Sequence, residues 1–316
     1  MSELSRRGVL ASGAAISALS ALPVRAEAGG ELSFLGLGDW GRDGASHQRD
    51  VAAAMGVRAA ELNSSFIITV GDNFYESGVQ SATDPQWKTS YEAVYVAPSL
   101  QTPWYAALGN HDYRGNPQAQ VDYAVTSPRW RMPARYYRQR VMTPAGAALD
   151  LFAIDTSPMV ARYAAAGEDA VIRGHVLSQD VAAQRVWLET ELGASDAPWK
   201  LVFGHHPVHS GGVHGDTAEL VAWLKPLLER HGVQAYICGH DHDLQHIVDG
   251  GVSYVCTGAG SEVRPVFAVK GTQFRASRSG FTAYRLAGDT LAVEFIDYAG
   301  AVLHTARIMQ KARVQA

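Results

Sequence analysis

The chain has 316 residues, of which 47% are hydrophobic and 18% are charged, with a formal net charge of −4 and a pI of about 6.3. This is a globular composition with enough apolar material for a sizeable core. The mild negative charge gives no indication of a nucleic-acid-binding or anionic-membrane surface, and we expect neither as a partner.

The amino terminus has the pattern of an export signal. Arg6 and Arg7 precede a mild apolar stretch over residues 9–22, and small-residue cleavage positions follow at Ala26 and Ala28. The stretch is too short and too weakly apolar to cross a membrane, so we expect no stable membrane insertion. We predict a twin-arginine export signal over residues 1–28, the twin-arginine machinery as a partner and a periplasmic or secreted location. A single domain is predicted over residues 29–316, and the oligomeric state is left open.

Strand and helix patterns alternate in the first half of the chain. The predicted strands are Leu32–Leu37, Phe66–Val70 and Trp104–Leu108, and helices are predicted over about Ala45–Leu62 and near Pro85–Val96. Such alternation is typical of crossover units in a parallel or mixed sheet. A polar, proline-containing stretch over residues 116–133 then precedes two strands predicted to pair, Arg135–Val141 and Leu149–Asp155.

The second half repeats this alternation and ends in short strands. The predicted elements are helix Val181–Leu192, strand Lys200–Phe203, helix Thr217–Arg230, strand Val233–Cys238 and five strands over residues 244–248, 252–256, 281–286, 291–296 and 302–308. We predict an α/β fold of four layers, α/β/β/α, in which two mixed sheets pack face to face with helices outside. Cys238 and Cys256 stand in apolar runs and are interpreted as buried thiols, although a disulfide between them is left open.

Five short blocks of metal-binding residue types stand at the ends of predicted strands. They are Gly38-Asp39-Trp40-Gly41, Gly71-Asp72-Asn73-Phe74-Tyr75, Gly109-Asn110-His111-Asp112, Val202-Phe203-Gly204-His205 and Gly239-His240-Asp241-His242. A glycine after a strand lets the backbone turn sharply, so that the next side chain faces the carboxyl edge of the sheet. One block alone is weak evidence for a metal site, because Gly-Asp and Gly-Asn turns are common. Five blocks in order supply carboxylate, amide, imidazole and phenol groups for two metal ions and indicate a dinuclear metallohydrolase.

The five blocks resemble those of the calcineurin-like metallophosphoesterases and, within them, the purple acid phosphatases of the small, mammalian-type, tartrate-resistant branch. The likeness extends over about residues 31–310 and includes residues 71–80, 204–208, 238–245 and 257–260. It implies that Asp39, Tyr75 and His242 bind Fe(III). It also implies that Asn110, His205 and His240 bind a divalent iron, zinc or manganese ion and that Asp72 bridges the two. The Tyr75 phenolate, a hard anionic ligand, would favour Fe(III) and give the purple colour.

The same resemblance implies the catalytic residues. His111 would contact the phosphoryl oxygens and assist the leaving group, with Asp112 orienting its ring, and His214 would be a second histidine on the substrate side. The expected reaction is hydrolysis of small phosphomonoesters, with an acidic optimum, by in-line attack of a metal-bound hydroxide. Two alternatives stay open: a phosphodiesterase or nucleotidase with the same metals, and a metal-bound protein that binds without catalysis.

Two further segments differ from the branch or stay ambiguous. Residues 156–180 correspond to a disulfide-tied loop over the active site but contain no cysteine, so we expect no disulfide-held lid. Whether this segment still shades the site is left open. His206 replaces a tyrosine and is interpreted as a packing residue at the rim, whereas Tyr113 and Arg114 either line the mouth of the site or are solvated.

Overall fold

The structure is a computed structural model that describes residues 30–311, so the predicted export signal lies outside the described residues. The first of its two seven-stranded mixed sheets has the strand order β14 (Val302–Met309), β13 (Thr290–Asp297), β12 (Gly280–Ala287), β1 (Leu32–Leu37), β2 (Phe66–Val70), β3 (Trp104–Ala107) and β4 (Trp130–Arg131). The second has the order β11 (Thr272–Ala276), β9 (Leu244–Asp249), β10 (Val252–Thr257), β8 (Ala235–Cys238), β7 (Trp199–Phe203), β6 (Ala148–Ala153) and β5 (Tyr137–Met142).

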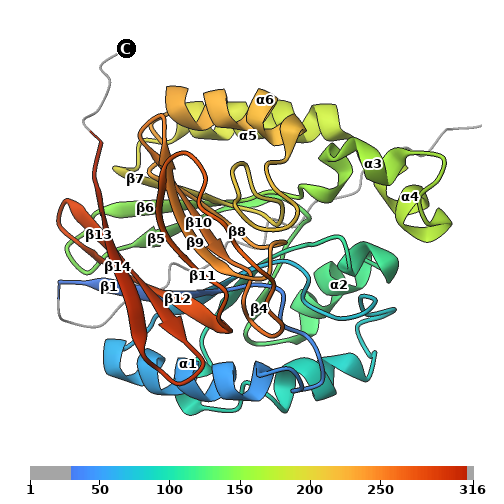
Figure 1. Ribbon diagram of the computed structural model, residues 1–316, viewed down its shortest axis with the longest axis horizontal. Helices are drawn as coiled ribbons and strands as arrows, with labels where there is room; N and C mark the ends of the chain where they lie inside the picture. Colours follow the sequence, from blue (N-terminus) through green and yellow to red (C-terminus); the bar gives the residue numbers. More distant parts are fainter. Residues whose placement is uncertain (1–29, 312–316) are drawn as a thin grey trace, which may run out of the picture.

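Helices cover the outer faces of the two sheets. Helix α1 (Gln48–Leu62) packs on β1 and β12, whereas α5 (Val181–Ala194) and α6 (Ala218–Arg230) cover the second sheet. Figure 1 shows α1 along one side of the sheets and α5 and α6 along the opposite side. The predicted four-layer α/β/β/α fold is therefore confirmed.

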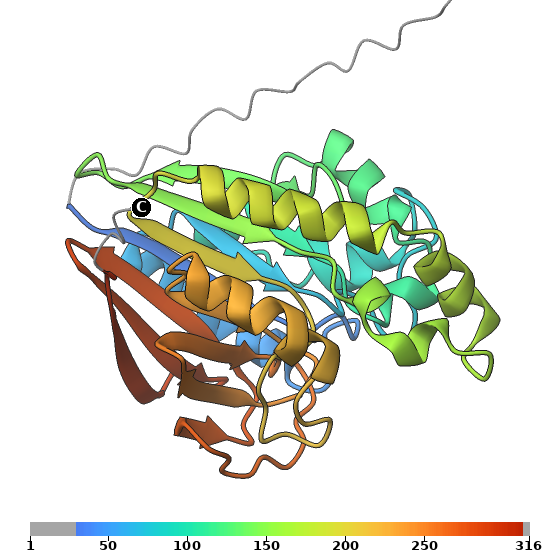
Figure 2. The ribbon, with the colours of Figure 1, turned by 90° about the horizontal axis from the view of Figure 1, so that it is seen from above.

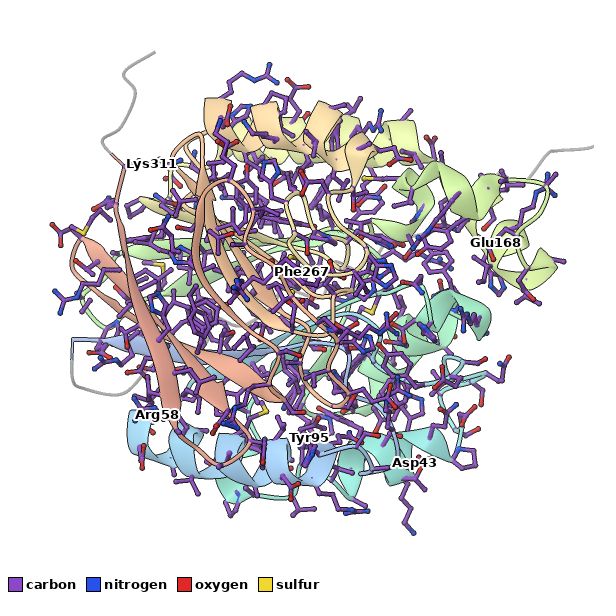
Figure 3. The ribbon with its side chains drawn as sticks, viewed as in Figure 1. Asp43, Arg58, Tyr95, Glu168, Phe267 and Lys311 are labelled. Atoms are coloured by element: carbon purple, nitrogen blue, oxygen red, sulfur yellow. The ribbon has the colours of Figure 1, made fainter. Side chains whose placement is uncertain are left out.

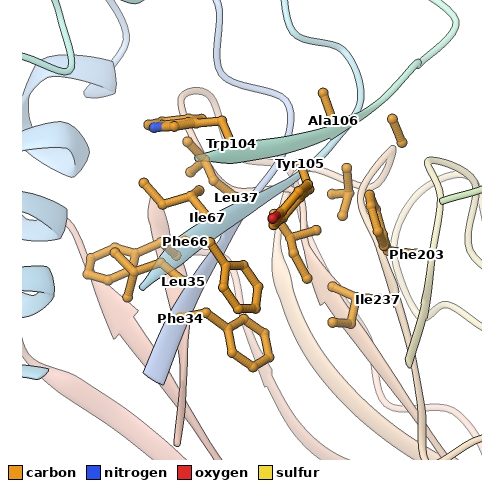
Figure 4. Close-up of a cluster of buried hydrophobic side chains, with 14 of the residues drawn as sticks. Phe34, Leu35, Leu37, Phe66, Ile67, Trp104, Tyr105, Ala106, Phe203 and Ile237 are labelled. Carbon is orange, nitrogen blue, oxygen red and sulfur yellow. The ribbon is translucent and has the colours of Figure 1, made fainter. Parts of the chain in front are cut away.

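The core between the sheets is built from inward-facing aromatic and aliphatic side chains. Phe34 stacks on Phe66, with ring centroids 4.6 Å apart, because parallel β1 and β2 place the two residues in register. In Figure 4 the Phe34, Phe66 and Tyr105 rings point toward Phe203 and Ile237 of the second sheet. Burial of each such side chain contributes about 1.5–3 kcal/mol to folding, so this contact fixes one sheet firmly against the other.

The strands that precede the five ligand blocks run parallel within each sheet. Strand β2 pairs in parallel with β1 and with β3 in the first sheet, and β7 pairs in parallel with β8 in the second. The carboxyl ends of parallel strands meet at the same edge of a sheet. Because the two sheets pack face to face, the five blocks gather at one end of the molecule.

Several connections differ from the sequence prediction. The helix predicted near Pro85–Val96 is a shorter π-helical turn over Trp87–Glu92. The stretch 116–133 contains α2 (Gln118–Thr126) and β4, which the sequence patterns did not predict. Residues 156–180 contain α3 (Ala161–Ala164) and α4 (Ala170–Leu177), which Figures 1 and 2 show at one end of the molecule. Asp169 caps α4 by accepting hydrogen bonds from Val171 N and Ile172 N, and alanine favours the helix.

Two negative findings apply to the described part of the chain. Within residues 30–311, no helix combines the length and the apolar character that a membrane span requires. Cys238 and Cys256 are both buried and both free, although they are partners in the register of β8 and β10. The interpretation of the two as buried thiols is confirmed.

Candidate metal centre

The backbone at the strand ends is bent so that the ligands face inward. Asp39, Asp72 and His240 have φ angles of 58°, 48° and 70°, in the left-handed region that non-glycine residues rarely occupy. A Cβ atom at Gly109 would overlap the Asp72 carboxylate, and one at Gly239 would overlap that of Asp39. The glycines of the blocks are therefore required for the close approach of the strand ends, and the strained backbone is concentrated at the site.

The first group of donors surrounds the Tyr75 hydroxyl. The hydroxyl oxygen lies 3.0 Å from Asp39 Oδ1, 3.0 Å from Asp72 Oδ2 and 3.1 Å from His242 Nε2. All four side chains are buried. A phenol has one proton, so it can donate to only one of these three neighbours. The remaining lone pairs point at the same small volume, which suits a cation.

The second group surrounds His205 Nε2. The His205 ring donates from Nδ1 to Val70 O at 3.0 Å, so Nε2 is the nitrogen through which the ring could bind a metal ion. That nitrogen lies 3.1 Å from Asn110 Oδ1 and 3.4 Å from Asp72 Oδ2, two oxygens that accept and do not donate. His240 Nδ1 is 3.2 Å from the same nitrogen. A cation among these atoms would satisfy acceptors that otherwise face one another.

The electrostatics of the site also favour bound positive charge. Burial raises the pKa of Asp39. Burial alone would raise the pKa of Asp72 too, but His205 and His111 hold it below its usual range. Burial opposes protonation of His205, yet the Asp72 and Asp39 carboxylates raise its pKa to about 9. The buried carboxylates thus hold a proton on His205, and a metal ion would replace that proton.

All seven predicted metal ligands converge. Donor atoms of Asp39, Asp72 and His205 lie within 4.8 Å of one another. His242 is held neutral, because burial and Arg264 lower its pKa to about 3. Hard oxygen donors with imidazoles on both sides of one carboxylate fit a pair of metal ions of the kind that the sequence predicted.

His206 lies close to this cluster but is engaged elsewhere. Its Nδ1 is 2.8 Å from Thr156 Oγ1, and its Nε2 is 3.0 Å from Tyr163 OH. The side chain is only 1% exposed, so the interpretation of His206 as a rim residue is wrong. It is a buried histidine that joins residues 156–163 to the floor of the site.

The His111 ring is oriented by a group that the sequence did not indicate. Its Nδ1 donates to the backbone oxygen of Glu76 at 2.8 Å, and its ring lies 4.5 Å from that of Tyr75. The expected contact with Asp112 is not made, and that prediction is wrong. The Asp112 carboxylate points back into the protein, where it accepts hydrogen bonds from Gly109 N, Asn73 N and Gln120 Nε2. Asp112 therefore ties together the second and third blocks.

His214 reaches the site from a separate loop. Its ring stacks on His240 with a centroid separation of 4.2 Å, and its backbone N–H donates to Asp241 Oδ1 at 3.0 Å. Asp241 stands between two predicted ligands and also accepts a hydrogen bond from Ser210 Oγ. The residue between the two histidines thus anchors the loop that carries His214.

A cavity of about 350 Å³ lies over the donors, which is a size that suits small organic ligands. His111 and His214 line it, and so do Tyr163, Glu168 and Ile172 of residues 156–180. That segment therefore shades the site without any disulfide. Arg114 lines the cavity as well, whereas Tyr113 is buried, with its hydroxyl donating to Asp155 Oδ2 at 2.5 Å.

Comparisons with known proteins agree with this geometry. Residues 32–244 match the family described as calcineurin-like phosphoesterase. The chain is 37% identical to Purple acid phosphatase 7 of Arabidopsis thaliana over 298 residues, which cover 92% of this chain and 89% of the relative. It is 34% identical to Tartrate-resistant acid phosphatase type 5 of Homo sapiens over 305 residues, covering 89% and 92%. A solved structure, GAP50, described as the anchor in the inner membrane complex of Plasmodium, is similar with a TM-score of 0.78 and 26% identity, covering 90% of each chain.

Proposed function

Because this chain belongs to the calcineurin-like phosphoesterases and, within them, to the purple acid phosphatases, we propose that it hydrolyses small phosphomonoesters at a dinuclear Fe(III)–M(II) centre. Family membership makes it a metal-dependent acid phosphatase. The convergence of seven donor side chains next to a cavity that His111 and His214 line supports the finer assignment.

The seven ligands divide into two sets around one carboxylate. Asp39, Tyr75 and His242 would hold Fe(III), and Asn110, His205 and His240 would hold a divalent iron, zinc or manganese ion. Asp72 would bridge them, since its Oδ2 lies 3.0 Å from Tyr75 OH and 3.4 Å from His205 Nε2. When bound, the two ions supply Lewis acidity toward the phosphoryl oxygens and activate the water that attacks phosphorus in line.

The remaining residues bind the phosphoryl group and move a proton. His111 is fixed through Nδ1 to Glu76 O, so its Nε2 is the nitrogen that can hold a proton toward the leaving-group oxygen. His214 faces the same cavity and would contact the phosphoryl oxygens as a second donor. Asp112 acts indirectly, by holding the turns that carry Asp72 and Asn110. An imidazole acid and a trivalent ion together predict an acidic optimum.

The experiment is turnover of p-nitrophenyl phosphate across pH by the iron-loaded protein, together with its visible spectrum. We expect a violet colour and faster hydrolysis at acidic pH. Substitution Tyr75→Phe should abolish the colour while leaving the fold intact by circular dichroism. A flat or alkaline profile contradicts the acid phosphatase assignment, and retained colour in the variant contradicts the Fe(III)–phenolate assignment.

Two other functions use the same centre. A phosphodiesterase or nucleotidase would prefer bis-p-nitrophenyl phosphate over the monoester. A protein that binds without catalysis gains support from the likeness to GAP50, which is described as an anchor. The presence of His111 and His214 at the cavity favours catalysis, since a binding protein needs no acid for a leaving group. Colour without turnover of either ester would favour the binding role.

The cellular location of the protein is proposed from the amino-terminal sequence alone. The twin-arginine pattern at Arg6 and Arg7 predicts export to the periplasm or the medium. Such routes carry folded proteins, which suits a chain that acquires its metals first. Conversion of both arginines to lysine should keep the protein in the cytoplasm, and unchanged export of that variant would contradict the signal.

A further inference from the structure

Three arginines stand at the mouth of the cavity, each from a different segment of the chain. Each lies against an imidazole. Arg264 Nη1 is 2.8 Å from His214 Nε2, and Arg162 Nη2 is 3.1 Å from His240 Nε2 and 2.6 Å from Tyr163 OH. Arg114 Nη1 is 3.3 Å from His111 Nδ1, which donates to Glu76 O and therefore does not accept a hydrogen bond from the guanidinium. Among residues 30–311, no carboxylate forms an ion pair with any of these three guanidinium groups. The mouth of the cavity therefore carries three guanidinium groups that are not held in ion pairs with carboxylates, although Glu76 lies within electrostatic range of Arg114.

Several arginines elsewhere in the molecule are paired with carboxylates. Arg138 and Arg140 both contact Asp150, and Arg129 contacts Glu92. Three guanidinium groups around one opening repel one another, and contacts with imidazoles offset this repulsion much less than carboxylates would. In a chain of net charge −4, such a cluster is suited to an anion that arrives from solution.

The contact of Arg162 with His240 is compatible only with the metal-free tautomer. Arginine can only donate, so His240 Nε2 must accept and Nδ1 must carry the ring proton. If His240 binds an ion through Nδ1, the nitrogen that faces His205, the proton moves to Nε2 and opposes the guanidinium. Arg162 is exposed, belongs to the short helix α3 and lines the cavity, where its guanidinium also donates to Tyr163 OH at 2.6 Å.

We propose that Arg162 and Arg264, with Arg114, form a second anion-binding subsite, which selects phosphomonoesters whose leaving group carries a further carboxylate or phosphate. The proposal rests on the function proposed above, because the scissile phosphoryl group occupies the donors beneath. Each guanidinium contacts a histidine of the site and lies one contact farther out than that histidine. The subsite therefore lies where the leaving group would be, and not at the phosphorus atom. The planar fork of arginine suits two oxygens of one anion.

Few carboxylates line the cavity beside the three arginines. Besides the predicted ligand Asp72, Glu168 is the one carboxylate among the described lining residues. It lies between α3 and α4, where Figure 3 labels it, and its Oε1 accepts from the backbone of Asp169. A carboxylate engaged in this way leaves the three arginines available to the substrate.

The first test compares two substrates that differ by one charge, phenyl phosphate and 4-carboxyphenyl phosphate. The wild-type enzyme should have a higher kcat/KM for the carboxylated ester. Arg162→Met and Arg264→Met should each lower the preference ratio by roughly fivefold, and the double variant should bring it close to one. Arg307→Met, a matched change at an exposed arginine on β14, should leave the ratio unchanged. A wild-type ratio of one or less, or an unchanged ratio in the double variant, overturns the subsite.

The second test measures binding without turnover. Calorimetry on the metal-loaded protein should show tighter binding of 3-phosphonopropionate than of ethylphosphonate, and the double variant should lose that difference. If the variant keeps it, the carboxylate binds elsewhere and the subsite is wrong. Ethylene diphosphonate shows whether phosphate or carboxylate is the better second anion. Absence of phenyl phosphate turnover would count against the proposed function alone, because this binding measurement still reports on the subsite.

Discussion

The cavity has a floor, formed by the seven predicted metal ligands, and a rim, formed by Arg114, Arg162, Arg264 and Glu168. The two are built in opposite ways. The floor is buried, is held by strand ends from two sheets and uses backbone conformations that few residues tolerate, such as φ of 70° at His240. The rim comes from connections between the strands and carries exposed side chains such as Arg114 and Arg162. The floor is specified by many mutually dependent contacts and therefore sets the chemistry. The rim can vary without disturbing the floor, so we expect differences in substrate preference to arise there.

The largest effect is expected from the carboxylate shared by the two donor groups. Asp72→Asn keeps the shape but removes the negative charge and one of the oxygens that would face two ions. We expect kcat/KM to fall by about a thousandfold or more, which corresponds to roughly 4 kcal/mol of transition-state stabilisation. Metal analysis should show fewer than two ions per chain. Normal metal content with near-normal activity would show that the floor does not depend on this bridge.

A smaller loss is expected at the boundary between floor and rim. His111→Ala should lower kcat by about a hundredfold, because it removes the predicted leaving-group acid, while both ions stay bound. The matched control is His47→Ala, at an exposed histidine paired with Asp50 away from the site. The loss at His111 should shrink for substrates with better leaving groups. An equal loss for all leaving groups would mean that His111 binds substrate and does not transfer a proton.

Stability should depend on the pH through a buried carboxyl beneath the rim. Burial raises the pKa of Asp155 to about 6, so the folded protein binds more protons than the unfolded chain between about pH 4 and pH 6. The contribution of Asp155 is therefore fully present at low pH and is lost as the pH rises through 6. Relative to Asp155→Asn, the wild-type protein should lose about 2 kcal/mol between pH 4.5 and pH 7 in urea unfolding. Parallel curves for the two proteins would contradict this prediction.

The smallest effect tests whether a charged side chain beside the floor influences the predicted metal ligands. The Arg42 guanidinium lies 3.9 Å from the centre of the Tyr75 ring and is held by Glu76 and Glu262. A cation over the ring lowers the energy of the phenolate electrons more than it lowers the energy of the metal orbitals that receive them. Removing the cation therefore lowers the energy of the charge-transfer transition. Arg42→Leu should therefore shift the visible absorption of the iron-loaded protein to longer wavelength without abolishing it. A band at the wild-type position would mean that the Arg42 charge does not influence the Tyr75 phenolate.

The five blocks could be recognised from the sequence because each is a local pattern of strand, glycine and ligand. The predicted strand Phe66–Val70, for example, matches the observed bounds of β2, and the donors after it converge as expected. Helices α3 and α4 were not predicted, because the segment is short, alanine-rich and without a clear amphipathic period. Their place over the cavity depends on contacts such as that between Tyr163 and His206, 43 residues apart.

The sequence by itself determined the fold class and the set of predicted metal ligands, since both follow from hydrophobic runs and from the residue types that end them. Only the tertiary structure decided how those side chains meet and what surrounds them. His205 reaches Val70 O across the two sheets, and His240 N donates to Asp39, 201 residues away. The same long-range packing turned Asp112 away from His111 and placed Arg162 and Arg264 at one opening. Such contacts join segments with no local relation in sequence, so no local pattern predicts them.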